Sequence, residues 1–399
     1  MADPEIDLNV DLNDSKKKDA GIPVATATAI PMIAQSVGGV SLSVPTDSHM
    51  DPQQIAALQQ QGFPYGLAVE MGNTRATYPR RFWVVDNSGS MRSSDGHQIR
   101  GTQNNIIVVE CNRWTELQDA VEYHAELAGL IKASTVFRML NDPGATVGPQ
   151  EFSVADTDSV SIADDVVRAK HIIRKSEPGG VTPLTAHIME IRERIRSVEH
   201  VLRSQGQRAV IVLATDGLPS NSFGESSDAV QKEFIEALRS LQSLPIWIVV
   251  RLCTDDDEVV EYYNNLDQVL ELPLEVIDDF FGEAKEIHDA NKWLNYALPL
   301  HRCREMGYQH RIFDLLDERL LNKDELREFL QLLFGSTTLD NAPNLHSDWK
   351  GFVGVLSEVV KREGMQWNPI SKKMGSWIDM KQLQKAYGKG GFRLFGKRK

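Results

Sequence analysis

Cysteine is scarce in this chain, because its 399 residues include only Cys111, Cys253 and Cys303. These three lie far apart and are odd in number, so their spacing shows neither a disulfide framework nor a zinc-ligand pattern. Reduced thiols are typical of proteins from a reducing compartment, and we therefore expect a cytoplasmic protein.

Positive charge is also in the minority, and the formal net charge is -13. A nucleic-acid-binding surface needs the opposite balance, so specific DNA binding is not expected. A long apolar run is missing too. The uncharged stretch between Asp19 and Asp47 contains prolines and glycines, which make it a poor membrane-spanning segment. The first residues also lack the layout of a secretory signal.

Composition divides the chain into four parts. We predict a disordered N-terminal tail over residues 1–60, an α/β domain over 76–298, a helical extension over 299–380 and a basic C-terminal tail over 381–399. The first part offers too little apolar surface to offset the entropy of ordering. The last part carries Lys and Arg between aromatic residues, which suits a weak contact with an anionic partner.

Short apolar runs alternate with helical patterns in the second part. Residues 82–85, 210–213 and 246–250 are continuous apolar runs, which suit strands buried on both faces of a parallel sheet. Residues 184–202 and 230–241 place apolar side chains three or four positions apart, as helices do. This order predicts a doubly wound, mostly parallel α/β sheet. Further helices are predicted over 312–316, 326–333 and 349–360.

Residues with oxygen-bearing side chains stand at the ends of these predicted elements. Asp86, Ser88 and Ser90 follow the first apolar run, Asp216 follows the second, and Thr182 lies in a Gly-rich loop before the long helical pattern. Because parallel strands end at one edge of a sheet, the two carboxylates would converge there if their strands are neighbours. They would then repel each other unless a proton or a cation lay between them. An all-oxygen set suits Mg²⁺, Mn²⁺ or Ca²⁺ and not zinc.

These residues resemble the metal-ion-dependent adhesion site (MIDAS) of the von Willebrand factor A (VWA) family. The family pattern is Asp-x-Ser-x-Ser, then a Thr in a Gly-rich loop, then an Asp after a central strand. Five residues fill these positions in order: Asp86, Ser88, Ser90, Thr182 and Asp216. The resemblance implies a Rossmann-like fold and a bound Mg²⁺, or Mn²⁺ or Ca²⁺, with one open coordination position. It also implies a partner protein whose Glu or Asp takes that position, so we expect a scaffold or assembly protein and not an enzyme.

The chain departs from the family pattern directly after the Asp-x-Ser-x-Ser segment. About twenty residues, from Arg92 to Arg113, precede the helix that we predict near Trp114. The apolar run over 104–109 within this insert predicts a hairpin beside the metal. Two roles stay open for it: it helps to choose the partner, or it partly covers the open coordination position.

Two other functions fit parts of the sequence. Two carboxylates, a metal and hydroxyls are the components of a metal-dependent hydrolase or phosphoryl-transfer enzyme, although no nucleophile or general base stands out near them. The basic C-terminal tail suits a membrane or RNA adaptor. His97, inside the insert, is interpreted as a surface-loop residue. The acidic run 255–258 is interpreted as a helix cap, because acidic side chains complement a helix N-terminus.

Overall fold

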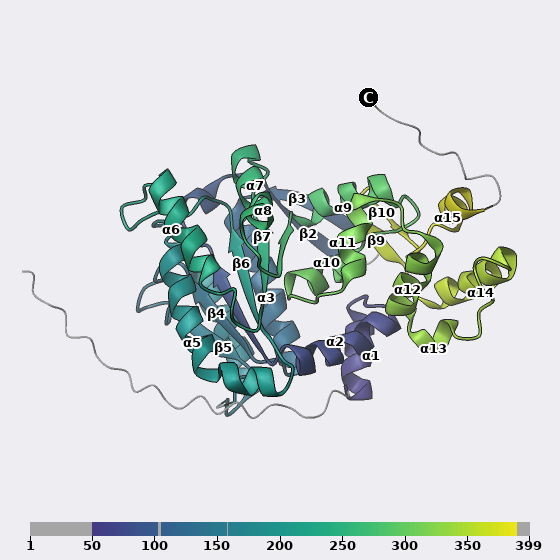
Figure 1. Cartoon of the computed structure of the whole chain (residues 1–399), viewed down its shortest axis with the longest axis horizontal. Coiled ribbons are helices and arrows are strands. Elements are labelled where there is room, and N and C mark those ends of the chain that lie inside the picture. The colour runs from purple at the N-terminus through teal and green to yellow at the C-terminus, as the bar shows by residue number, and fades with distance from the viewer. Residues whose placement is uncertain (1–49, 103–104, 158, 389–399) are drawn as a thin grey trace, which may run out of the picture. The chain divides into compact units, whose positions relative to one another are not determined.

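A computed structural model describes residues 50–102, 105–157 and 159–388, and its main feature is a six-stranded sheet (Figure 1). The strands lie in the order β5, β4, β1, β6, β7, β8. All neighbouring pairs are parallel except β4 with β5. The strand bounds are β1 Arg80–Val85, β4 Thr135–Met139, β5 Glu151–Val154, β6 Ala209–Thr215, β7 Ile246–Leu252 and β8 Leu274–Ile277. The protein is therefore a mixed α/β structure, compatible with a Rossmann-like arrangement.

The three predicted apolar runs are the central strands of this sheet. Every residue of β1, β6 and β7 is buried, which is why these segments read as continuous apolar runs rather than as alternating patterns. Successive side chains of each strand point to opposite faces. In β1, Phe82 and Val84 pack into one apolar core, while Trp83 and Val85 pack into another.

Helices cover both faces of the sheet. The core of Phe82 and Val84 is closed by α5 (Leu184–Ser204), α6 (Asp228–Arg239) and α7 (Asp257–Asn264). The core of Trp83 and Val85 is closed by α3 (Arg113–Ile131) and α4 (Ile162–Lys175). The helices predicted at 184–202 and 230–241 are confirmed as α5 and α6, and the apolar spacing of each forms its buried face.

A third apolar core joins the two ends of the described chain. Helices α1 (Pro52–Gln60) and α2 (Tyr65–Thr77) share it with most of the elements that follow the sheet, and Figure 1 shows α2 beside α12. Those later elements are α9 Phe280–Ala290, α10 Leu298–Glu305, α11 Arg311–Glu318, α12 Lys323–Phe334, α13 Ser336–Leu339, α14 Trp349–Arg362, the β9–β10 hairpin (Gln366–Asn368 and Lys373–Gly375) and α15 Met380–Tyr387. The predicted boundary at 298 therefore runs through one continuous core.

Both predicted tails are too long where the structure describes them. Asp51 caps α1 in a capping box, Pro52 begins the helix and Leu58 is fully buried, so residues 52–60 belong to the fold. At the other end α15 extends to Tyr387, and Leu383 is fully buried. Sequence reasoning missed both helices because each is short and contributes few apolar residues. The rest of the two predicted tails, 1–49 and 389–399, lies outside the described residues.

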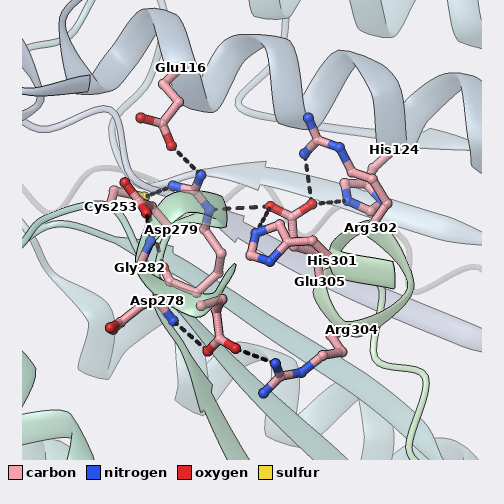
Figure 2. A network of polar contacts seen from close by, with 12 residues as sticks. Glu116, His124, Cys253, Asp278, Asp279, Gly282, His301, Arg302, Arg304 and Glu305 are labelled. Carbon is pink, nitrogen blue, oxygen red and sulfur yellow. Dashed lines mark hydrogen bonds and ion pairs between the residues drawn. The ribbon is translucent and has the colours of Figure 1, made fainter. Parts of the chain in front are cut away.

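A buried ionic network attaches α10 to the sheet (Figure 2). The Glu305 carboxylate is completely buried and lies 2.7 Å from Nη1 of Arg302, 3.0 Å from Nε2 of His124 on α3 and 3.3 Å from Nε of Arg251 on β7. Arg251 also donates to Glu116 on α3 at 2.6 Å. Burial alone would raise the pKa of Glu305, but Arg302, His301 and His124 outweigh it and hold that pKa well below the usual range.

Among the described residues, no helix combines the length and the apolar character that crossing a lipid bilayer requires.

Candidate functional site

The ends of β1 and β6 form the candidate site. The two strands are neighbours in parallel register, with Val85 opposite Ala214, and the Asp86 N–H donates to the Ala214 carbonyl at 2.9 Å. Asp86 and Asp216 therefore leave the sheet at the same edge, as the sequence analysis required. Both are buried, with only 0% and 3% of their surfaces exposed.

Two of the predicted hydroxyl ligands lie between these carboxylates. Ser88 Oγ and Ser90 Oγ are 2.9 Å apart, and Ser90 Oγ donates to Oδ1 of Asp216 at 2.8 Å. The Ser88 N–H donates to Oδ1 of Asp86 at 2.8 Å. Every second residue of the Asp-x-Ser-x-Ser segment thus turns its side chain toward one centre.

The Gly-rich loop brings Thr182 to the same centre. Thr182 Oγ1 and Ser90 Oγ each lie 4.0 Å from the point where a Cβ on Gly217 would stand. The loop is held from two sides, because the Gly89 N–H donates to the Gly180 carbonyl at 3.2 Å and the Thr182 N–H donates to Ser220 Oγ at 2.9 Å. The structure therefore gathers all five predicted ligands at one edge of the sheet.

Burial makes the two carboxylates electrostatically costly. Loss of solvent and, next, the neighbouring charge of Asp216 raise the pKa of Asp86 to about 6. Hydrogen bonds from Thr215 and Ser88 oppose this rise in pKa; Thr215 Oγ1 donates to Oδ2 of Asp86 at 2.6 Å. The role of Thr215 as a donor to Asp86 was not predicted from the sequence.

Arg113 is the site residue that sequence reasoning missed. Its Nη1 donates to Oδ2 of Asp216 at 2.9 Å, and its side chain is only 14% exposed. Arg113 is the last residue of the insert and the first residue of α3, and no motif marks it. The insert itself is confirmed as a hairpin of β2 (Gly96–Thr102) and β3 (Asn105–Cys111), apart from residues 103–104, which are not described.

The donor set fits a hard divalent cation. It consists of two buried carboxylates and three hydroxyls, and one guanidinium balances only one of the two negative charges. Oxygen donors of this kind suit Mg²⁺, Mn²⁺ or Ca²⁺. Asp86, Ser88, Ser90, Thr182 and Asp216 would hold the ion, and their remaining negative charge would favour it.

A second group of metal-binding side chains lies nearby but fits an ion less well. Ligand atoms of His97, Glu116 and Asp279 lie within 4.8 Å of one another. Glu116 already accepts from Arg251 and from the His97 N–H, while Oδ1 of Asp279 caps α9. The Arg251 guanidinium beside Glu116 also opposes a cation there. His97 itself lies in strand β2, so the prediction that it is a surface-loop residue is wrong.

The acidic run 255–258 acts as predicted. Asp256 is the N-cap of α7 and accepts from the Glu258 and Val259 N–H groups at 3.0 and 3.3 Å. These acidic residues therefore stabilise the start of a helix.

Comparison with known proteins gives no relative: no family model matches the chain, and no curated protein matches it.

Proposed function

We propose that the chain contains a doubly wound VWA-type domain with a MIDAS, and that it is a metal-dependent protein-binding module. The observation that carries the proposal is the geometry of the site. Asp86 and Asp216 end two adjacent parallel strands, and Ser90 Oγ lies within hydrogen-bond distance of both Ser88 Oγ and the Asp216 carboxylate. The order of the five residues along the sequence is that of the family pattern.

A cation at this place would serve as a bridge between two proteins. Two carboxylates supply most of its countercharge, and neutral hydroxyls supply further oxygens, so a coordination position can be left to a Glu or Asp of a partner. None of the five predicted ligands is a histidine or a cysteine. We therefore favour binding over turnover, in a cytoplasmic scaffold or assembly role. The three cysteines, all free, agree with a reducing compartment.

The surroundings of the site suit a protein partner. Phe223 is 87% exposed, and its loop is tied to the Gly-rich loop, since the Ser220 N–H donates to the Thr182 carbonyl at 2.9 Å. An exposed aromatic side chain at the rim of a charged site is a common anchor in protein interfaces. We propose that the partner places an acidic residue on the metal and an apolar residue against Phe223.

Cation uptake tests the metal site directly. Mg²⁺ is titrated calorimetrically into the full chain and into Asp86→Asn, Asp216→Asn and Asp142→Asn. Asp142 is an exposed acid on the loop after β4 and serves as the matched control. We expect one bound ion for the wild type and the control, and none for the other two variants. Circular dichroism checks that all variants are folded. Unchanged Mg²⁺ uptake by both site variants would refute the assignment.

Partner capture tests the binding function. Pull-downs with the full chain are run in Mg²⁺ and in EDTA, with Asp86→Asn and Phe223→Ala beside the wild type. We expect partners to be lost in EDTA and with Asp86→Asn, and weakened with Phe223→Ala, which retains its Mg²⁺ uptake. The rival hydrolase hypothesis predicts EDTA-sensitive turnover of generic phosphatase and esterase substrates, and we expect no such turnover.

A further inference from the structure

Arg113 connects the candidate metal site to the base of the insert hairpin. Its guanidinium contacts two carboxylates: Nη1 lies 2.9 Å from Oδ2 of Asp216, while Nε and Nη2 lie 2.7 and 2.5 Å from the two oxygens of Asp95. Asp216 has no exposed side-chain surface, whereas the Asp95 side chain is 47% exposed. A fixed positive charge thus stands beside a predicted metal ligand.

The insert hairpin holds the Arg113 guanidinium in position. Asp95 directly precedes β2 and Arg113 directly follows Asn112, the N-cap of α3. Gly96 pairs with Cys111 at the closed base of the hairpin, and the Arg113 N–H donates to the Ser93 carbonyl at 3.0 Å. Both ends of the insert are therefore held together at Asp216, so the position of the guanidinium depends on the hairpin.

Asp216 has a protein donor on each of its oxygens, because Ser90 Oγ donates to Oδ1 and Arg113 donates to Oδ2. Each hydrogen bond occupies one lone pair and fixes the carboxylate in place, so Arg113 disfavours coordination of an ion by both oxygens of Asp216. Ca²⁺ takes six to eight oxygens and often binds a carboxylate through both of them, whereas Mg²⁺ keeps several waters and needs fewer protein oxygens. The guanidinium also repels any cation at the site.

We propose that Arg113 determines the cation affinity and selectivity of this site, lowering the affinity for all divalent ions and lowering it more for Ca²⁺ than for Mg²⁺. The inference rests on the proposed metal site. It gives the insert a role at the metal site. The hairpin positions the Arg113 guanidinium, which competes with a bound metal ion for the Asp216 carboxylate.

Arg113→Gln tests the inference, with Arg92→Gln as the matched control. Arg92 is exposed, ends the short helix η1 (Gly89–Arg92) and lies in the same insert. Mg²⁺ and Ca²⁺ are titrated calorimetrically into the full chain. For Arg113→Gln we expect about tenfold tighter Ca²⁺ binding and a smaller gain for Mg²⁺, as loss of a nearby like charge allows. For Arg92→Gln we expect a smaller change in both constants than for Arg113→Gln, because its exposed charge is better screened by salt.

Thermal unfolding gives a second readout. Without its guanidinium neighbour the buried Asp216 is uncompensated, so Arg113→Gln should melt at a lower temperature than wild type in EDTA. A divalent ion should then raise its melting temperature by more than it raises that of the wild type. Asp95→Asn is expected to change the cation affinity in the opposite direction. It leaves the Arg113 charge less compensated, so it should bind both ions more weakly than wild type.

The outcomes separate the two hypotheses. Equal or weaker Ca²⁺ binding by folded Arg113→Gln, with normal uptake by the wild type, would overturn the role of Arg113 and leave the metal site standing. If Arg113→Gln does not fold in EDTA, tighter binding by Asp95→Asn would overturn it in the same way. Absence of uptake by the wild type would overturn both hypotheses.

Discussion

The side chain of Asn87 makes two hydrogen bonds to the backbone of Asn141, accepting from its N–H at 2.8 Å and donating to its carbonyl at 3.0 Å. The Asn141 side chain in turn makes two hydrogen bonds to the backbone of Val181, in the Gly-rich loop. It donates to the Val181 carbonyl at 2.8 Å and accepts from the Val181 N–H at 3.2 Å. Two asparagines thus connect the loop of Ser88 and Ser90 to the loop of Thr182.

Asn141→Ala should loosen the Thr182 loop. Both backbone groups of Val181 lose their partner, so we expect unfolding to become easier by about 1–3 kcal/mol. We also expect weaker Mg²⁺ uptake, because Thr182 is no longer held in position. Urea unfolding and calorimetric titration measure the two effects. Asn264→Ala, on the exposed side of α7, is the control and should change neither quantity. A stable Asn141→Ala variant with normal uptake would show that the asparagines do not hold the site.

Gly180→Ala should be much more costly than Gly206→Ala. Both glycines have positive φ angles, +90° and +65°, so each substitution carries a backbone cost of about 1–2 kcal/mol. A Cβ on Gly180 would also stand 2.3 Å from Oδ1 of Asn141, whereas a Cβ on Gly206 would meet nothing within 4 Å. We expect overpacking to add about 1–3 kcal/mol at Gly180 only. Urea unfolding compares the two variants, and equal losses would contradict the crowding seen around the Gly-rich loop.

Sequence reasoning found the central strands and the five oxygen donors because both leave local signals. β1, β6 and β7 are continuous apolar runs, and the donors directly follow or precede recognisable elements. β4 left a weaker signal, since Arg138 interrupts its apolar residues, and it was not predicted although it pairs with β1. Arg113 and Asn141 were missed for another reason. Their roles depend on contacts across 103 and 40 positions of the chain, which no local pattern encodes.

Glu305→Gln should destabilise the protein strongly. The variant leaves Arg302 without the Glu305 carboxylate and leaves the buried Arg251 with the carboxylate of Glu116 but not that of Glu305, and breaking a buried ion pair in this way costs about 3–5 kcal/mol. Glu358→Gln removes an exposed pair with Lys361 and should cost less than about 1 kcal/mol. Urea unfolding of both variants gives the comparison. A small loss for Glu305→Gln would mean that the network in Figure 2 contributes little to holding α10.

Acidic pH should weaken the same network through His124. Burial lowers the pKa of His124 from 6.5 to about 4, and the hydrogen bond to Glu305 opposes this only in part. Between these two pH values the unfolded chain binds a proton that the folded chain does not. The contribution of His124 to the free energy of unfolding is therefore complete above pH 6.5 and decreases as the pH falls toward 4, by about 3 kcal/mol in all.

Urea unfolding between pH 4.5 and 7.5 measures the slope, and His124→Gln should reduce it. The pKa of Glu305 in the folded chain is held well below its ordinary value of 4.5. As the pH falls below about 4.5, the unfolded chain therefore takes up a proton on this carboxylate first, and the protein loses further stability. An identical slope in His124→Gln would assign the pH dependence to other groups.

The apolar core shared by α1, α2 and the helices after the sheet limits how far the protein can be truncated without exposing apolar side chains. Phe63, Leu67 and Met71 lie in one cluster with Leu330 and Phe352, far along the chain. An expression fragment limited to residues 76–298 would expose to water the side chains that it contributes to that cluster, such as Leu127 and Ile131, and an exposed apolar surface of this kind favours aggregation. Fragments for crystallisation or NMR should therefore keep residues 50 to 388 together.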